Sequence, residues 1–290
     1  MYLTKFKSPK NKVVQCIECG GIGYYLNEKM TVSHTGALSL CSCVTKNCSC
    51  KGDIKSNYRI YDRTQNKLIP CECFEKRLEY QKLGVLFKKS GIPLKYQYRT
   101  LDQIEYGETI GKSFTKAREL SLNLIKSWNI NTEKKGIYLH GKTGTGKTLL
   151  GCCVINELIF RYNATCKFAK INRDFLNVLR DSYQKESETY GKETQIENEF
   201  INVDLLVLDD FGVQNDTDWT NTKIYDLIDS RYENGKITLL TSNLDLEKLK
   251  DILGQNIYSR LIEMTEPILL DCEDYRLKIA ERKISLMKLV

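Results

Sequence analysis

The sequence predicts an α/β fold, in which helices cover a parallel sheet that carries a phosphate-binding loop, preceded by a small module held by metal. Three observations lead to this prediction. Beyond about residue 100, short apolar runs alternate with stretches of helical spacing, which is typical of a parallel sheet with helices on its faces. Residues 141–148 contain a complete glycine-rich phosphate loop. Eight of the twelve cysteines lie between Cys16 and Cys73.

The composition is that of a folded globular protein, since 41% of the 290 residues are hydrophobic. The formal net charge is 44 basic minus 37 acidic residues, or +7, which permits nucleic-acid binding without requiring it. The sequence shows no apolar stretch of about 18 residues and no secretory signal, so we expect a cytoplasmic protein with no membrane span. In a reducing compartment, metal binding explains the cysteines better than disulfides do.

The uneven distribution of the cysteines predicts three parts. We expect residues 1–75 to form a cysteine-rich, zinc-binding docking module, residues 76–100 a helical linker and entry segment, and residues 101–290 the α/β domain. Phe74–Gly91 is predicted to be a charged helix that ends at a glycine before Pro93. The four later cysteines lie in apolar or helical surroundings and are interpreted as small buried hydrophobic residues.

The periodicity assigns the elements of the α/β domain in chain order. Val203–Leu208 is a continuous apolar run, typical of a strand buried on both faces. Tyr183–Glu199 is the most polar stretch and is expected to be a loop or a frayed helix end. We expect strands at residues 136–140, 165–169, 203–208, 237–240 and 268–270. We expect helices at residues 147–162, 174–183, 222–232, 244–253 and 257–264, and a final helix after residue 270.

Residues 141–148 fit the Walker A pattern, with a strand before the loop and a helix after it. The glycines let the loop curl so that backbone N–H groups converge on phosphate oxygens, and the N-terminus of the following helix adds partial positive charge. Lys147 can reach the β- and γ-phosphates, and the Thr148 hydroxyl is placed to ligate Mg²⁺. The residues expected to bind ATP and its metal ion are Gly141, Thr143, Gly144, Thr145, Gly146, Lys147, Thr148 and Asp209.

A second motif, Leu205–Asp210, consists of four apolar residues followed by two carboxylates. The carboxylates come at the carboxyl end of a strand, which is the edge where ligands bind in parallel sheets. Asp209 is predicted to hold Mg²⁺, directly or through water, and Asp210 to orient and polarise the attacking water. The alternative is a strand end that happens to be acidic, and the phosphate loop earlier in the chain argues against it.

Several short motifs, the Asp-Asp motif among them, follow one another in a fixed order along the second part of the chain. They are Ser90–Pro93, Tyr98–Leu101, the Asp-Asp motif through Gly212, Asp229–Tyr232, Thr238–Asn243, Tyr258–Leu261 and Asp274–Arg276. Together, over roughly residues 90–285, they resemble the AAA+ ATPases of the bacterial helicase-loader group (DnaC and DnaI) and their relatives, the IstB-type transposition helpers. Twenty residues (290 minus 270) follow Leu270, so we expect no C-terminal lid domain, a truncation that both groups share.

The resemblance implies roles for three further residues. Asn243 ends a segment similar to the sensor 1 strand, and its amide would hold the attacking water beside the Walker B strand. Arg260 resembles an arginine finger that reaches the nucleotide of a neighbouring subunit. Arg276 resembles a second arginine that senses phosphate from the same or the adjoining subunit. The alternatives are an asparagine that begins a turn and two surface arginines. The implied catalytic residues are Asp210, Asn243, Arg260 and Arg276.

The early cysteines have the spacing of zinc ligands. Some loader-like proteins similarly combine a leading Cys-x-x-Cys with a trailing Cys-x-Cys, which here would join Cys16 and Cys19 to Cys71 and Cys73. The four cysteines between them would form a second site across a hairpin; they are Cys41, Cys43, Cys48 and Cys50. One site instead of two, reduced free thiols, thiol redox chemistry or an iron–sulfur cluster are the alternatives.

The resemblance implies an ATP-dependent loader of a replicative DNA helicase, which binds the helicase and single-stranded DNA and hydrolyses ATP at the subunit interfaces of a homo-oligomer. In the family, a helix after the second strand lines a groove for single-stranded DNA. Here the bases Lys170, Arg173 and Arg180 suit a phosphate track, and Tyr183 could stack on a base. An ordinary helix with solvated charges is the alternative.

Two other functions remain open at this point. The first is an IstB-like ATPase helper of a transposase that acts on duplex DNA. The second is an ATP-dependent adaptor that does not hydrolyse ATP and binds a protein through its zinc module. The cysteine module favours the loader over the transposition helper, which usually lacks one. The intact Asp209, Asp210 and Arg260 argue against the adaptor.

Overall fold

The computed structural model describes residues 16–27, 37–46, 48–104, 111–130, 133–214 and 217–277. The chain divides into two compact units between Val85 and Leu86, and each unit is described by itself. The division falls inside the helix that was predicted at Phe74–Gly91, which the structure places at Phe74–Lys89 (α2). The final helix expected after residue 270 falls largely outside the described residues.

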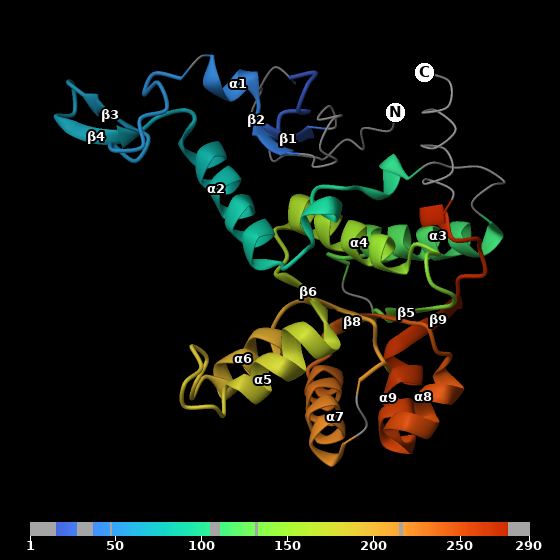
Figure 1. The fold of residues 1–290 in the computed structure, drawn as a ribbon. Coiled ribbons are helices and arrows are strands. Elements are labelled where there is room, and N and C mark those ends of the chain that lie inside the picture. The colour runs from blue at the N-terminus through green and yellow to red at the C-terminus, as the bar shows by residue number, and fades with distance from the viewer. Residues whose placement is uncertain are drawn as a thin grey trace, which may run out of the picture. The chain divides into compact units, whose positions relative to one another are not determined.

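The first unit is built from two small antiparallel hairpins (Figure 1). The first hairpin pairs Tyr24–Asn27 (β1) with Ala37–Leu40 (β2), and the second pairs Arg59–Asp62 (β3) with Lys67–Pro70 (β4). A single turn of helix, Ser42–Thr45 (α1), joins them. Among the described residues of this unit, one small cluster of five buried side chains forms, three of them cysteines: Val44, Cys50, Tyr58, Cys71 and Cys73. So small a core favours stabilisation of the fold by metal.

The second unit contains a five-stranded sheet in the order β6-β7-β8-β5-β9, with parallel pairing throughout. The predicted parallel α/β sheet is therefore confirmed. The strand before the phosphate loop lies between the last strand and the strand that was expected to carry Asn243. The strands are Gly136–His140 (β5), Cys166–Lys170 (β6), Leu205–Asp209 (β7), Ile237–Ser242 (β8) and Thr265–Leu269 (β9).

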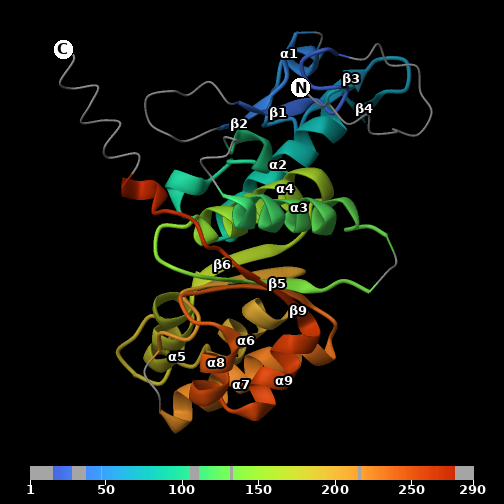
Figure 2. The same ribbon diagram turned by 90° about the vertical axis from the view of Figure 1, so that its right-hand side faces the viewer.

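Helices cover both faces of this sheet (Figures 1 and 2). One face carries Lys112–Lys126 (α3) and Lys147–Tyr162 (α4), and α4 is buried along most of its length. The other face carries Asn177–Asp181 (α5), Glu193–Ile201 (α6), Asp218–Glu233 (α7), Leu246–Leu253 (α8) and Gln255–Met264 (α9).

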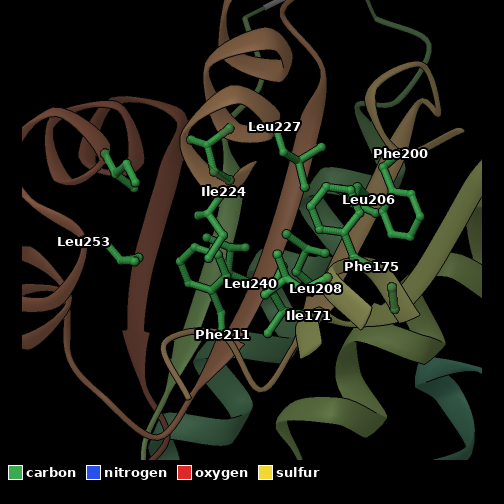
Figure 3. Packing of buried hydrophobic residues seen from close by; sticks show 14 of the residues in the cluster. Ile171, Phe175, Phe200, Leu206, Leu208, Phe211, Ile224, Leu227, Leu240 and Leu253 are labelled. Atoms are coloured by element: carbon green, nitrogen blue, oxygen red, sulfur yellow. The ribbon is translucent and has the colours of Figure 1, made fainter. Parts of the chain in front are cut away.

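A large hydrophobic core fills the space between the sheet and the helices of the second face (Figure 3). Leu206 and Leu208 of β7 point into it, beside Leu240 of β8. Phe175 and Phe200 meet with their ring centroids 4.7 Å apart and close the core beside the edge strand β6. Because these side chains are fully buried, the central strands are held rigidly, and their carboxyl ends form a fixed edge.

In the α/β domain, helices α3 and α6 were not predicted from the sequence. The polar stretch expected to be a loop contains α6, which buries Ile196 and Phe200, four residues apart on one side. Its other side is held by Lys223, whose ammonium lies 2.7 Å from Glu193 and 2.9 Å from Glu197. The expectation of a loop was therefore wrong for residues 193–199. The helix expected at 174–183 begins instead with a π-helical turn, Ile171–Leu176.

Among the described residues, no helix is long and apolar enough to cross a membrane.

Candidate nucleotide site and metal centres

The phosphate loop leaves β5 and curls back through three glycines in the left-handed region of backbone space. Their φ values are +138° at Gly141, +81° at Gly144 and +93° at Gly146. A side chain would also collide with neighbours, since a Cβ atom on Gly146 would lie 2.7 Å from the Phe114 ring. The loop therefore requires glycine at these positions. Thr143 is exposed in the loop, whereas Thr145 is buried and its hydroxyl donates to the carbonyl of Lys142 (3.0 Å).

Lys147 and Thr148 begin α4 directly behind the loop. The Lys147 ammonium donates to the loop carbonyls of Gly141 and Lys142, each at 2.7 Å. Burial lowers the pKa of Lys147, and the nearby carboxylates of Asp209 and Asp210 oppose this shift. The Thr148 hydroxyl donates to Oδ1 of Asp209 (2.7 Å), so the structure brings the two predicted Mg²⁺ ligands together. A hydroxyl beside a buried carboxylate is a donor set that fits Mg²⁺.

Asp210 has a different environment from its neighbour. Asp209 is 1% exposed, whereas the Asp210 side chain is 48% exposed and its backbone has φ +59°. The ammonium of Lys170, at the end of β6, lies 2.7 Å from Oδ2 of Asp210 and 3.8 Å from Oδ2 of Asp209. The hydrogen bond to Asp210 raises the pKa of Lys170. Lys170, predicted as a DNA contact, is thus also part of the carboxylate site.

The strand expected to carry Asn243 lies beside β7, as predicted. Asn243 follows its last residue and is exposed. A residue not singled out from the sequence, Thr241, makes a direct contact with the carboxylate of Asp209, since its hydroxyl donates to Oδ1 (2.6 Å). The two consecutive hydroxyl residues at the end of this buried central strand, Thr241 and Ser242, were the available signal.

The segment after β9 lies directly on the phosphate loop. The backbone N–H of Tyr275 donates to the carbonyl of Gly144 (3.1 Å), and the Cys272 thiol donates to the carbonyl of Thr145 (3.4 Å). The Asp274 carboxyl packs so closely on Gly144 that a Cβ there would lie 2.0 Å from it. Arg276 follows this contact, and its positive charge contributes to the lowered pKa of Lys147. The structure therefore places Arg276 beside the loop, while its role stays a prediction.

Arg260 lies on α9 and is held by residues of α7. Its guanidinium forms an ion pair with Asp229 and donates to the hydroxyl of Tyr225 (3.1 Å). It also lies over the rings of Tyr225 and Tyr232, at 5.0 and 5.8 Å from their centroids. The side chain is 25% exposed, so the group is fixed in place yet reachable from solvent.

In the segment predicted to contact DNA, Arg173 and Arg180 pair with groups other than the carboxylates of the nucleotide site. Arg173 pairs with its neighbour Asp174 at 2.6 Å and remains 67% exposed. Arg180 lies over the ring of Trp219 (5.2 Å), which the Tyr183 ring meets edge-on. An arginine and two aromatic rings therefore gather at this surface, a combination suited to nucleic-acid bases.

The eight early cysteines form two separate clusters, and in each cluster the four sulfur atoms lie within 4.8 Å of one another. The first contains Cys16, Cys19, Cys41 and Cys43, and the second contains Cys48, Cys50, Cys71 and Cys73. The pairing predicted from the resemblance, which joined Cys16 and Cys19 to Cys71 and Cys73, was therefore wrong. The clusters follow chain order because each hairpin carries the ligands at its own base.

The chemistry of both clusters fits zinc. Four thiols converge in each, and four thiolates around one ion are a common structural zinc site. Each cluster has a donor beside it: the backbone N–H of Gly23 lies 3.2 Å from the sulfur of Cys19, and Nε of Arg77 lies 3.2 Å from that of Cys73. Such donors stabilise the negative charge of bound thiolates. Zinc would supply a structural crosslink at these positions.

The fold and the nucleotide site together define a P-loop AAA+ ATPase. Residues 80–283 match the family model described as IstB-like ATP binding protein. The chain belongs to this family, which confirms the resemblance found in the motifs. Its members bind ATP and are ATPases.

Curated relatives and solved structures agree with this assignment. The chain is 29% identical over 121 residues to the replicative helicase loader DnaC of Escherichia coli (strain K12), covering 42% of this chain and 47% of that protein. It is 26% identical over 169 residues to the replicative helicase loader DnaI of Bacillus subtilis (strain 168), covering 53% and 51%. A crystal structure of the DnaC helicase loader matches with a TM-score of 0.51 at 25% identity, covering 61% and 99%. The chain thus spans about half the length of the curated relatives it matches.

Proposed function

We propose that this protein acts in the cytoplasm as an ATP-dependent loader of a replicative DNA helicase. The observation that carries the proposal is the similarity of its ATPase domain to proteins named replicative helicase loaders. The match to the IstB-like family keeps a second candidate open, an ATPase helper of a transposase on duplex DNA. The two cysteine clusters favour the loader, because a separate metal-stabilised module of this kind would give the chain a surface for docking to a helicase.

In this proposal the amides and glycines of residues 141–148 hold the phosphates of ATP, and Lys147 neutralises their charge. Thr148 and Asp209, which lie in hydrogen-bond contact, would hold Mg²⁺, and the ion would neutralise charge that develops on the phosphates during hydrolysis. Asp210 accepts the proton of the attacking water, and Asn243 orients that water. These roles use the exposure of Asp210 and the burial of Asp209, since a base must reach water while a metal ligand must be fixed.

At the subunit interface, Arg260 would contact the nucleotide of a neighbouring subunit, whereas Arg276 would contact the phosphates at the loop of its own subunit. Support comes from the position of each residue. Arg260 lies on α9 and is held by an ion pair with Asp229 of α7, and Arg276 follows the segment that lies on Gly144. A positive charge supplied by a second subunit would make hydrolysis depend on assembly into a homo-oligomer.

The zinc module would bind the helicase while the ATPase domain engages single-stranded DNA. On the β3–β4 hairpin, Tyr61 and Leu68 lie opposite each other and are 57% and 58% exposed. Exposed aromatic and aliphatic side chains of this kind serve as anchors in protein interfaces. On the ATPase domain, the exposed Arg173 and the pair of Arg180 and Trp219 would contact the DNA strand.

Co-purification of the full chain with the replicative helicase of the same genome tests the proposal. We expect a stable complex with the wild type and its loss in Tyr61→Ala/Leu68→Ala, with the cysteine clusters intact. Arg173→Ala/Arg180→Ala should keep the helicase and lose affinity for a fluorescent oligo-dT strand, more so at low salt. Recovery of a transposase in place of the helicase, or tighter binding to duplex than to single-stranded DNA, would replace the loader by the transposition helper.

A further inference from the structure

We propose that Thr241 is a positioning residue that sets the orientation of both carboxylates at the nucleotide site. Thr241 lies near the end of β8, between the phosphate-loop strand β5 and the carboxylate strand β7, and is 1% exposed. The inference rests on the proposed ATP hydrolysis. It assigns to Thr241 a task that is separate from the contacts of Lys147 with phosphate.

The Thr241 side chain makes two contacts in opposite directions. Its hydroxyl donates to Oδ1 of Asp209 (2.6 Å) and accepts from the backbone N–H of Asp210 (3.2 Å). The backbone carbonyl of Thr241 also accepts from the N–H of Phe211 (2.8 Å). One residue of β8 therefore fixes three consecutive residues where β7 ends.

The conformation of Asp210 explains why this support matters. With φ +59°, Asp210 occupies the left-handed region, which costs energy for a residue that has a Cβ. Such a conformation persists only where the surroundings hold it in place. The bonds from Thr241 to the N–H groups of Asp210 and Phe211 provide this hold, and they turn the Asp210 side chain away from the buried position of Asp209.

The same hydroxyl fixes Asp209 for metal binding. Oδ1 of Asp209 accepts from Thr148 (2.7 Å) and from Thr241 (2.6 Å), so two donors from different elements determine the plane of the carboxylate. The single oxygen of the Thr241 hydroxyl both donates to Asp209 and accepts from Asp210, and a valine side chain of the same shape can do neither. Groups that orient metal ligands in this way typically change metal affinity or activity by about 10- to 100-fold when they are removed.

The experiment compares Thr241→Val, which keeps the shape of the side chain, with Thr241→Ser, which keeps the hydroxyl. Three quantities are measured on the full chain: affinity for a fluorescent ATP analogue without metal, kcat for ATP hydrolysis, and the Mg²⁺ concentration for half-maximal hydrolysis. Thr238→Val is the matched control, because Thr238 is buried on the same strand and its hydroxyl accepts from Arg231 (2.9 Å), away from the carboxylates.

For Thr241→Val we expect metal-free nucleotide affinity within about twofold of wild type, a kcat lowered about 10- to 100-fold, and a higher Mg²⁺ requirement. Thr241→Ser should recover most of both losses, and Thr238→Val should keep both wild-type values. Wild-type kcat and Mg²⁺ dependence in Thr241→Val would overturn the inference, and so would failure of the serine variant to recover activity. If the valine variant does not fold, Thr241→Ala is measured against Thr241→Ser by the same criteria. Absence of ATP hydrolysis in the wild type would instead refute the proposed function.

Discussion

Lys170 places a positive charge directly on the carboxylate that is proposed to activate water. Its ammonium lies 2.7 Å from Asp210, and both side chains are partly exposed, at 41% and 48%. An ion pair this exposed contributes at most about 1 kcal/mol. The ammonium occupies Oδ2 of Asp210, and Lys170→Ala would free this oxygen for the attacking water, so the substitution should raise ATP hydrolysis measured without DNA by up to about fivefold.

Arg173→Ala is the control for this measurement, since Arg173 pairs with Asp174 and not with Asp210. Steady-state hydrolysis without DNA should stay at the wild-type rate in Arg173→Ala. An unchanged or lower DNA-free rate in Lys170→Ala would show that the ion pair does not restrain Asp210.

At the residue scale, motif reading predicted the phosphate loop and the two carboxylates because their chemistry depends on contiguous residues. The bond from Thr148 to Asp209 follows directly from those motifs. The contacts of Thr241 with Asp209 and of Lys170 with Asp210 depend on the order of strands in the sheet, which brings β6, β7 and β8 together. Spacing along the chain carries no information about such lateral neighbours, so these contacts could not be predicted.

Among the secondary-structure elements, α6 and β8 are joined to α7 by one buried arginine. Arg231 is 0% exposed and donates to four backbone carbonyls and to the Thr238 hydroxyl. Burial lowers its pKa, and the negative charge of Asp204 opposes this shift. Arg231→Met would leave the buried carbonyls without a donor, so we expect a loss of about 3 kcal/mol or more in the free energy of unfolding.

Urea denaturation followed by circular dichroism measures this loss. Arg173→Met, at an exposed position, should change stability by less than about 0.5 kcal/mol. A comparable small effect in Arg231→Met would contradict the structural role of the buried arginine.

The order of ligands in the zinc module gives a second prediction for the elements. If the clusters follow chain order, Cys16→Ser/Cys41→Ser removes ligands from one site only and should leave one zinc ion per chain. Cys16→Ser/Cys71→Ser removes a ligand from each site and should lower the zinc content further. Elemental analysis of protein never exposed to chelator distinguishes the two variants. A lower zinc content in Cys16→Ser/Cys41→Ser than in Cys16→Ser/Cys71→Ser would instead support the pairing that the resemblance implied.

The elements were predicted unevenly for a physical reason. Strands β5 and β7 are short and buried on both faces, so their continuous apolar runs identify them. Helix α6 buries only Ile196 and Phe200, and it is further held by Lys223 and Arg231 of another helix. The pairing of the cysteines was missed because spacing alone does not show which hairpin brings two pairs together.

For the whole molecule, the position of Arg260 leads to a prediction about assembly. Among the described residues, its partners lie on α7 and α9, and it is fixed there while one part of the side chain stays exposed. Arg260→Ala should therefore bind ATP normally and lose the hydrolysis that requires a neighbour. Asp210→Asn should show the same combination, because it keeps the phosphate loop but lacks the proton acceptor.

Mixing these two inactive variants tests whether the site is shared between subunits. In a head-to-tail assembly, each interface combines the finger of one subunit with the carboxylates of the next. With random mixing at equal amounts, about one interface in four has both groups intact, so hydrolysis should return to at most about a quarter of the wild-type rate. Each variant alone, at the same total concentration, serves as the baseline. If mixed assemblies are confirmed by differently tagged subunits and hydrolysis still does not return at any ratio, Arg260 does not act across the interface, and its ion pair with Asp229 would then be a structural contact between α7 and α9.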